Sequence, residues 1–156
     1  MSIKPETTLL PFLIRAKKAT YVGGGAKASA SRTGAHDLTY EEGEWSYRDS
    51  YFGGTDFIGQ EVVWHKAVPI WSMCYYGYIL RADLIMPTQA GSIIKRALSQ
   101  PQAQGRLLDN LTFETDNFKY EIVSEGEVAH FKGRETIRTA NTLAYALDYF
   151  GGLVRA

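Results

Sequence analysis

The feature that most constrains the fold is a stretch in which a glycine pair joins two aromatic segments with few charges. Residues 49–64 read Asp-Ser-Tyr-Phe-Gly-Gly-Thr-Asp-Phe-Ile-Gly-Gln-Glu-Val-Val-Trp, and an apolar run at 70–77 follows. Glycine permits sharp turns, whereas β-branched and aromatic residues favour strands. The stretch therefore predicts a sheet that turns at Gly53 and Gly54 and is packed with rings.

Composition limits the partners that the protein can have. The 156 residues fit one domain, residues 1–156, and 17 Lys plus Arg balance 17 Asp plus Glu. A neutral chain lacks the basic surface that nucleic-acid-binding proteins and polybasic membrane anchors use, so we expect neither partner. Because Cys74 is the single cysteine and no segment reads as a membrane span or signal peptide, we expect a cytoplasmic protein.

Hydrophobic spacing predicts two helices and a series of strands. Apolar residues on one face predict a helix over 8–19, stopped by glycines 23–25, and a second from Thr88 or Ser92 to Leu98. Alternation predicts strands near 38–40, 45–51, 60–65, 70–80, 117–123, 128–132 and 142–150, with 26–35 as a loop. The strands at 60–65 and 70–80 are apolar on both faces, which is typical of the middle of a covered sheet. The predicted fold is α+β: a twisted antiparallel sheet of about six to eight strands with two helices packed against it.

Two short strings occur twice in the chain. Tyr-Phe-Gly-Gly stands at 51–54 and 149–152, and Glu-Gly-Glu stands at 42–44 and 125–127, where it predicts turns. They hint at a pseudo-repeat of sheet halves, but chance and shared hairpin chemistry explain such short matches better.

The aromatic residues indicate a small-molecule pocket. Trp64, Trp71, Tyr75 and Tyr76 crowd the two central strands, and Tyr51 precedes them. Tyrosine and tryptophan carry polar groups that a purely structural core does not need, and ring-lined pockets are typical ligand sites. Cross-strand aromatic pairing is the structural alternative for each ring taken singly.

Polar residues complete the predicted site. Glu61 starts an apolar strand, so its carboxylate should be ion-paired or should line a pocket, with Asp56 and Arg32 supplying further recognition. His36 adjoins Asp37 just before a strand. The predicted ligand-binding residues are Arg32, His36, Tyr51, Asp56, Glu61, Trp64, Trp71, Tyr75 and Tyr76. No catalytic residue is assigned, and because no metal-ligand, phosphate-loop or nucleophile motif occurs, neither a metal nor a cofactor is expected.

The chain resembles a bacterial family of domains of unknown function. The resemblance is carried by His36-Asp37-Leu38, 51–54, 57–64, Pro69, Trp71-Ser72-Met73 and Tyr75-Tyr76-Gly77, and it extends from 12–24 to 133–152. It implies that members occur alone or fused behind helix-turn-helix domains of the Cro-repressor type, where such domains often sense effectors. This chain begins at the family domain, so we do not carry DNA binding over, and no catalytic residue comes with the resemblance.

Three functional hypotheses follow. In the first, the protein binds or senses an unknown small molecule in an aromatic pocket between residues 49–64 and 71–78, without chemistry of its own. In the second, it is a small hydrolase-type enzyme with His36 as base and Asp49, Asp56 or Glu61 as acid or metal ligand. In the third, it is an interaction module, a homodimer whose exposed aromatic residues meet across an interface.

Overall fold

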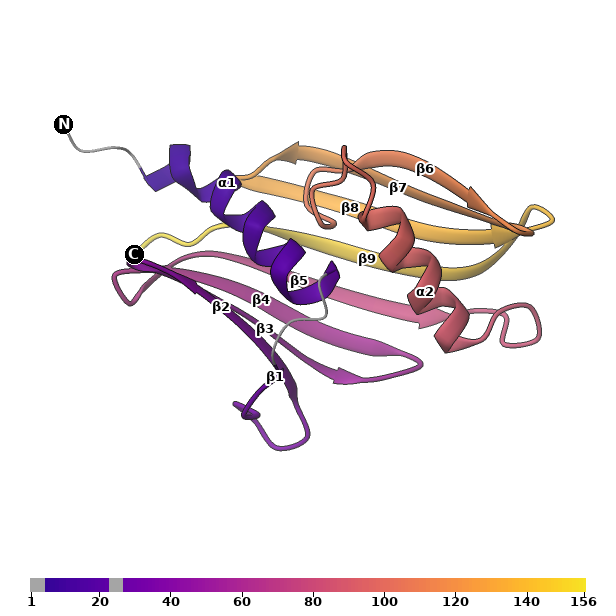
Figure 1. Ribbon diagram of the computed structural model, residues 1–156, viewed down its shortest axis with the longest axis horizontal. Helices are drawn as coiled ribbons and strands as arrows, with labels where there is room; N and C mark the ends of the chain where they lie inside the picture. Colours follow the sequence, from indigo (N-terminus) through magenta and orange to yellow (C-terminus); the bar gives the residue numbers. More distant parts are fainter. Residues whose placement is uncertain (1–4, 23–26) are drawn as a thin grey trace.

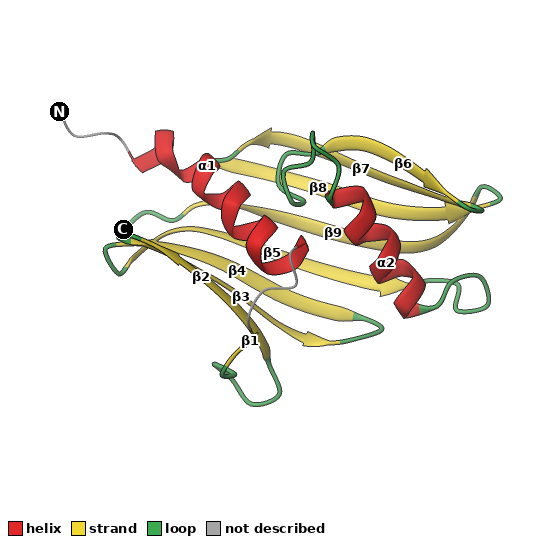
Figure 2. Cartoon of the chain, in the orientation of Figure 1, coloured by secondary structure: helices red, strands yellow, loops and turns green. Residues whose placement is uncertain are grey.

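The computed structural model describes residues 5–22 and 27–156, which form one antiparallel sheet with helices on one face (Figures 1 and 2). The elements in chain order are α1 (Pro5–Lys17), a π-helical turn η1 (Lys18–Val22), β1 (Lys27–Ala28), β2 (His36–Glu42), β3 (Trp45–Gly53), β4 (Phe57–His65), β5 (Val68–Ile79), α2 (Pro87–Leu98), β6 (Asn110–Thr115), β7 (Phe118–Glu127), β8 (His130–Thr139) and β9 (Thr142–Leu153). The strand order across the sheet is β1-β2-β3-β4-β5-β9-β8-β7-β6.

The predicted fold class was wrong in strand number and in balance. The sheet has nine strands rather than six to eight, and the protein is mostly sheet. The loop predicted for 26–35 contains β1, whose two paired residues are too few to show a period. Prediction also missed β6, although its alternating burial is regular. The turn predicted at 125–127 lies inside β7, where Glu125, Gly126 and Glu127 pair with β8 up to His130.

Both predicted helices are confirmed. Along α1, four buried apolar residues face the sheet: Leu9, Phe12, Leu13 and Ala16. α2 begins at Pro87, a residue favoured in the first helical turn, and the Gln89 side chain accepts a hydrogen bond from the Met86 amide at 2.9 Å. The predicted glycine stop at 23–25 lies outside the described residues.

The two halves of the sheet have the same construction. α1 precedes the meander β2–β5, and α2 precedes the meander β6–β9. The halves join at the centre, where β5 pairs antiparallel with β9. In Figure 1 the two helices cross the same face of the sheet, one over each half.

Between β4–β5 and β8–β9, the correspondence extends to single residues at a constant offset. Glu61 on β4 and Glu135 on β8 are both buried, and each is followed by a β-bulge, after Val63 and after Ile137. The same offset relates Gly59 to Gly133, Gly77 to Gly151, Tyr75 to Tyr149, and the positive-φ turn Lys66-Ala67 to Ala140-Asn141. The repeat is therefore structural. The twice-occurring strings do not mark it, because one copy of Tyr-Phe-Gly-Gly begins in β3 and the other lies in β9.

The sheet has a covered and an open face. β4 and β5 are central, as predicted, but the expectation that both of their faces are covered was wrong. Side chains that point away from the helices include Ile58 and Tyr76, which are 54% and 45% exposed. The covered face holds the aromatic and aliphatic core, so a site built there starts in a low-dielectric layer.

Candidate functional site

A cavity of about 440 Å³ lies between the covered face of the sheet and the helices. Thr20 and Tyr21 of η1 and Gly91 and Lys95 of α2 line it from the helical side. We call it the Asp49 cavity; its remaining lining residues are Lys27, Leu38, Asp49, Tyr51, Gly53, Gly54, Phe57, Tyr75 and Arg106. It belongs to the first half of the sheet, because its strand residues come from β1–β5.

Two buried ion pairs stand beside the cavity. Lys17 Nζ lies 2.8 Å from each carboxylate oxygen of Glu61, and Tyr47 donates a hydrogen bond to the same carboxylate. In the second half, Arg106 Nε lies 3.0 Å from Glu135 Oε2. Two tyrosines also donate to Glu135: Tyr120 at 2.6 Å and Tyr145 at 2.9 Å. Each buried glutamate is therefore neutralised and hydrogen-bonded, which is what a buried charge needs in order to be tolerated.

Asp49 is a third buried carboxyl group in this layer, and its surroundings differ. Its side chain is on β3, the residue is 5% exposed, and Tyr75 Oη donates a 2.6 Å hydrogen bond to Oδ1. Within residues 5–22 and 27–156, no lysine, arginine or histidine lies within ion-pair distance of Asp49. The group borders the cavity instead. A buried carboxyl without a cation is costly, so the position calls for an explanation.

Burial and a neighbouring charge make Asp49 titrate near neutrality. Burial first, and the negative charge of Glu61 second, raise the pKa of Asp49 to about 7, although the Tyr75 hydrogen bond and the charges of Lys17 and Arg106 oppose the shift. Burial and the nearby Asp49 carboxylate raise the pKa of Tyr75 well above its ordinary value, so Tyr75 stays a donor at neutral pH. The cavity wall thus holds a carboxyl group that can carry or release a proton at physiological pH.

The second half shows that the fold does not require this carboxyl group. Asp49 lies opposite Glu61 in the β3–β4 pairing, and Ile122 lies opposite Glu135 in the β7–β8 pairing. The hydroxyl of Tyr75 meets Asp49, whereas that of Tyr149 meets Ser124. The same scaffold position therefore holds a buried apolar residue in one half and an acid beside a cavity in the other.

Some predicted site residues meet at this cavity. Tyr51 and Tyr75 line it. Glu61 is ion-paired, one of the two predicted outcomes, and its partner is Lys17. The His36 ring packs against Tyr51 in a tilted arrangement, with ring centroids 5.1 Å apart, and His36 is not a lining residue.

The other predicted residues lie elsewhere. Trp71 is fully buried in the core, where its indole N–H donates to the Val128 carbonyl at 3.0 Å. Arg32 and Trp64 line a hollow on the open face, and Tyr76 is on that face too. Asp56, in the turn after β3, accepts a 3.0 Å hydrogen bond from the Ile79 amide. The predicted set is divided between two faces because neighbouring strand residues point in opposite directions.

Sequence reasoning missed the helical side of the cavity. Lys27 was missed as well, but it lies on β1, which pairs with β2. Gly91, Lys95 and Arg106 come from α2 and the connection after it, distant in sequence from the aromatic stretch. Arg106 follows Gly105 in the connection after α2 and has a positive φ of 66°. No local pattern marks these residues, since only the packing of the helices onto the sheet brings them to β3 and β5.

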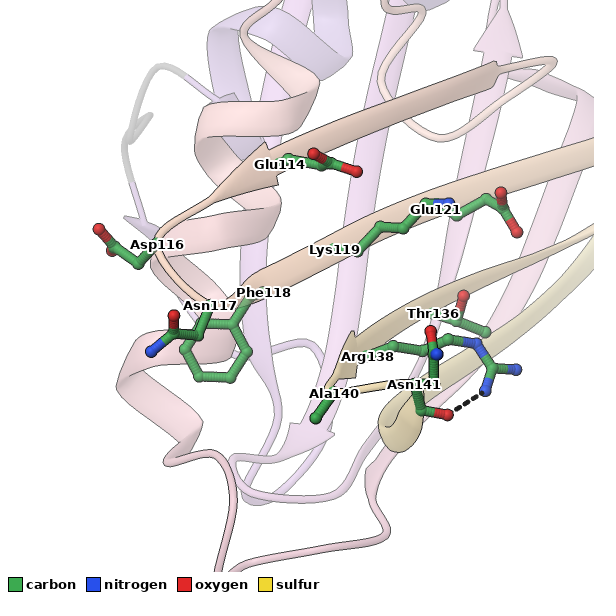
Figure 3. Close-up of a pocket in the computed structure, with 10 residues that line it drawn as sticks. All are labelled: Glu114, Asp116, Asn117, Phe118, Lys119, Glu121, Thr136, Arg138, Ala140 and Asn141. Atoms are coloured by element: carbon green, nitrogen blue, oxygen red, sulfur yellow. Dashed lines mark hydrogen bonds between the residues drawn. The ribbon is translucent and has the colours of Figure 1, made fainter.

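A second hollow, of about 390 Å³, lies at one end of strands β6–β9 (Figure 3). Its charged residues are exposed, among them Glu114, Lys119 and Glu121. The hydrogen bond drawn in Figure 3 joins Arg138 Nη1 to the Asn141 carbonyl at 3.4 Å. None of its lining residues is buried. This hollow therefore lacks the desolvated polar group that distinguishes the Asp49 cavity.

Two further features bear on the site. In the part of the chain that the structure describes, His, Cys, Asp and Glu side chains form no group of three or more that could hold a metal ion. Over the same residues, no helix combines the length and the apolar character needed to cross a membrane.

Comparison with known proteins places the chain in a family. A family model described as "Domain of unknown function (DUF5680)" matches residues 49–154. The match begins at Asp49 and includes β4–β9, whereas α1 and Lys27 lie outside it. No curated protein and no solved structure matches the chain. Because the match covers more than half of the sequence, the chain belongs to the DUF5680 family of domains of unknown function.

Proposed function

We propose that the protein binds a small molecule in the Asp49 cavity and has no catalytic chemistry of its own. One observation carries the proposal: Asp49 is buried at the cavity wall without a cation, while its counterpart Ile122 shows that the sheet is built equally well without the acid. A costly group that the scaffold does not need is best explained by a ligand that contacts it.

The shape and lining of the cavity support this function. Its volume falls within the roughly 300–1,000 Å³ typical of small-molecule sites. The rings of Tyr51, Phe57 and Tyr75 supply apolar walls, and few polar groups converge on the space. This combination of aromatic walls and sparse polar groups is what ligand pockets use to bind and orient small molecules.

A larger side chain in the cavity tests the proposal. Gly91 lines the cavity, and no atom lies within 4 Å of the position that a Cβ would take there. The side chain of Gly91→Leu should therefore project into the cavity and occupy part of it. Ser92→Leu, which adds the same side chain to an exposed position of the same helix, is the matched control.

The probe is N-phenyl-1-naphthylamine, whose fluorescence rises in apolar sites. The wild type and Ser92→Leu should bind it, and Gly91→Leu should bind it at least about tenfold more weakly, a difference of about 1.4 kcal/mol. Equal binding by all three proteins would contradict the proposal. Native mass spectrometry of the protein as purified, before and after a denaturing wash, would then show whether Gly91→Leu also loses a co-purifying molecule.

One observation favours a catalytic alternative. A general acid–base works best when its pKa is near the working pH, and the pKa of Asp49 is about 7. In this alternative, Asp49 rather than His36 transfers the proton, because His36 packs against Tyr51 outside the cavity lining. Conversion of a bound molecule by the wild type, lost in Asp49→Asn while binding persists, would favour the enzyme over the binding domain.

A sensing role is the finer form of the proposal. It is supported by the resemblance to domains fused behind Cro-type regulators and by the helical side of the cavity, where η1 and α2 would both contact a ligand. Ligand binding should then slow amide hydrogen exchange in α2 more than in β6–β9. Uniform protection of the chain would argue for binding without a conformational signal.

A further inference from the structure

We infer that the ligand of the Asp49 cavity is a planar, largely apolar molecule with a hydrogen-bonding group at its inner end and an anionic group at its outer end. The inference rests on the proposed function and adds the chemical class of the ligand. Three parts of the cavity lead to it: the buried polar groups, the aromatic walls and the exposed lysines.

At the inner end, Asp49 is the buried acid that is open to a ligand. Thr20 Oγ1 donates its hydroxyl proton to the Ala16 carbonyl at 2.8 Å. Arg106 is held by Glu135 and stacks with its guanidinium 5.0 Å from the Tyr21 ring centroid. Asp49 has its hydrogen bond from Tyr75 at Oδ1, and its carboxyl group can pair with one more donor or acceptor. A hydroxyl, amine or amide at the inner end of the ligand would make that bond.

The walls favour a flat molecule. Phe57 and Tyr75 meet edge to face, with ring centroids 6.1 Å apart and planes inclined by 62°. Tyr51 lies on the neighbouring strand and also lines the space. Aromatic side chains arranged in this way pack well against the faces and edges of another ring. A planar conjugated or aromatic body would therefore bury the most apolar surface here.

The outer end is positive. Lys27 on β1 and Lys95 on α2 are exposed and line the cavity from different elements. Within the described ranges, neither ammonium group has an ion-pair partner, and the cavity lining contains no acid besides Asp49. Two unpaired cations at a cavity mouth attract an anion, and their mobile side chains suit a carboxylate, sulfonate or phosphate group.

A pair of fluorescent probes tests the inference. 8-Anilino-1-naphthalenesulfonate and N-phenyl-1-naphthylamine share the naphthalene ring and the secondary amine, and they differ by one sulfonate. The wild type should bind the sulfonate about tenfold more tightly than the neutral probe. The double variant Lys27→Gln/Lys95→Gln should remove this difference. Lys119→Gln/Lys132→Gln changes two exposed lysines on the open face and should preserve it.

The outcomes separate the inference from the proposed function. If Gly91→Leu blocks the neutral probe but the sulfonate binds no more tightly, the cavity binds ligands and the anionic class is wrong. The same conclusion holds if the Lys27→Gln/Lys95→Gln variant keeps the preference for the sulfonate. If Gly91→Leu blocks neither probe, the proposed function fails and the inference fails with it.

Discussion

Asp49 and Ile122 occupy equivalent positions in the two halves of the sheet, yet one is an acid and the other an aliphatic residue. Both lie opposite a buried glutamate, Glu61 for Asp49 and Glu135 for Ile122. The two halves therefore serve as internal controls for each other. Residues that both halves share are those that the fold needs. Positions at which the halves differ are candidates for a function.

The stability of the protein should depend on pH through Asp49. Its folded pKa of about 7 exceeds the roughly 3.9 of an unfolded aspartate, so the folded chain holds this proton more tightly. Ionisation therefore disfavours the folded state as pH rises from about 4 to above 7, by up to about 4 kcal/mol. Asp49→Asn cannot ionise, so its free energy of unfolding relative to wild type should increase by about 2–4 kcal/mol between pH 5 and pH 8.

Urea denaturation at several pH values measures this difference. Asp116→Asn removes an exposed carboxyl group and serves as the control, with no comparable trend. A constant difference between Asp49→Asn and wild type across the pH range would show that Asp49 is ionised throughout.

Breaking the Lys17–Glu61 ion pair should destabilise the protein strongly. Lys17→Met leaves the Glu61 carboxylate buried without its cation, and such losses cost about 3–5 kcal/mol. Arg15→Met, on the same helix as Lys17, breaks the exposed ion pair between Arg15 and Glu42 of β2 and should change stability very little. Denaturant titration of both variants gives the comparison, and similar losses in the two would refute a special role for the buried pair.

Alanine at two equivalent glycines should separate stability from binding. A Cβ at Gly59 would press on the Tyr75 ring and stand 2.7 Å from Tyr51 Cβ, while a Cβ at Gly133 would press on Tyr149. Each substitution overpacks a tyrosine and should cost about 1–3 kcal/mol. Only Gly59→Ala moves a ring that lines the Asp49 cavity, so only this variant should weaken binding of N-phenyl-1-naphthylamine. Equal binding losses would mean that the probe reports general loosening of the fold.

Gly91→Ala should stabilise the protein. Gly91 lies inside α2, its Cβ position is open, and alanine is the better helix former by roughly 0.5–1 kcal/mol. A small rise in melting temperature, with retained probe binding, is the expected result of a thermal scan. A loss of stability would mean that the added methyl group clashes with neighbouring atoms, so the space beside Gly91 would not be open.

Patterns within one segment were predicted well from the sequence. The period of α1 and the two-sided apolar character of β4 and β5 follow from neighbouring residues alone, and the structure confirms both helices and the central place of these strands. β1 was missed because its pairing is set by its neighbour β2 rather than by its own two residues.

The site could be predicted only in part, because its geometry depends on faces and on distant partners. Tyr51 and Tyr75, predicted from the density of aromatic residues, line the Asp49 cavity, whereas Trp64, predicted for the same pocket, lies on the open face next to a β-bulge that no sequence pattern marks. Asp49 was named only as a possible acid of an enzyme. Its isolation from cations becomes visible when Lys17 and Arg106 are seen bound to other carboxylates.

The central pairing of β5 with β9 also has a consequence for how the chain folds. Each meander joins strands that follow one another in sequence. In contrast, Tyr75 on β5 pairs with Tyr149 on β9, and α2 and strands β6–β8 lie between them in the sequence. Closing so long a loop is entropically expensive, so the two meanders should form early and dock late. Until they dock, β5 and β9 are bare edges, and a domain-swapped partner would enter the sheet there, at its middle.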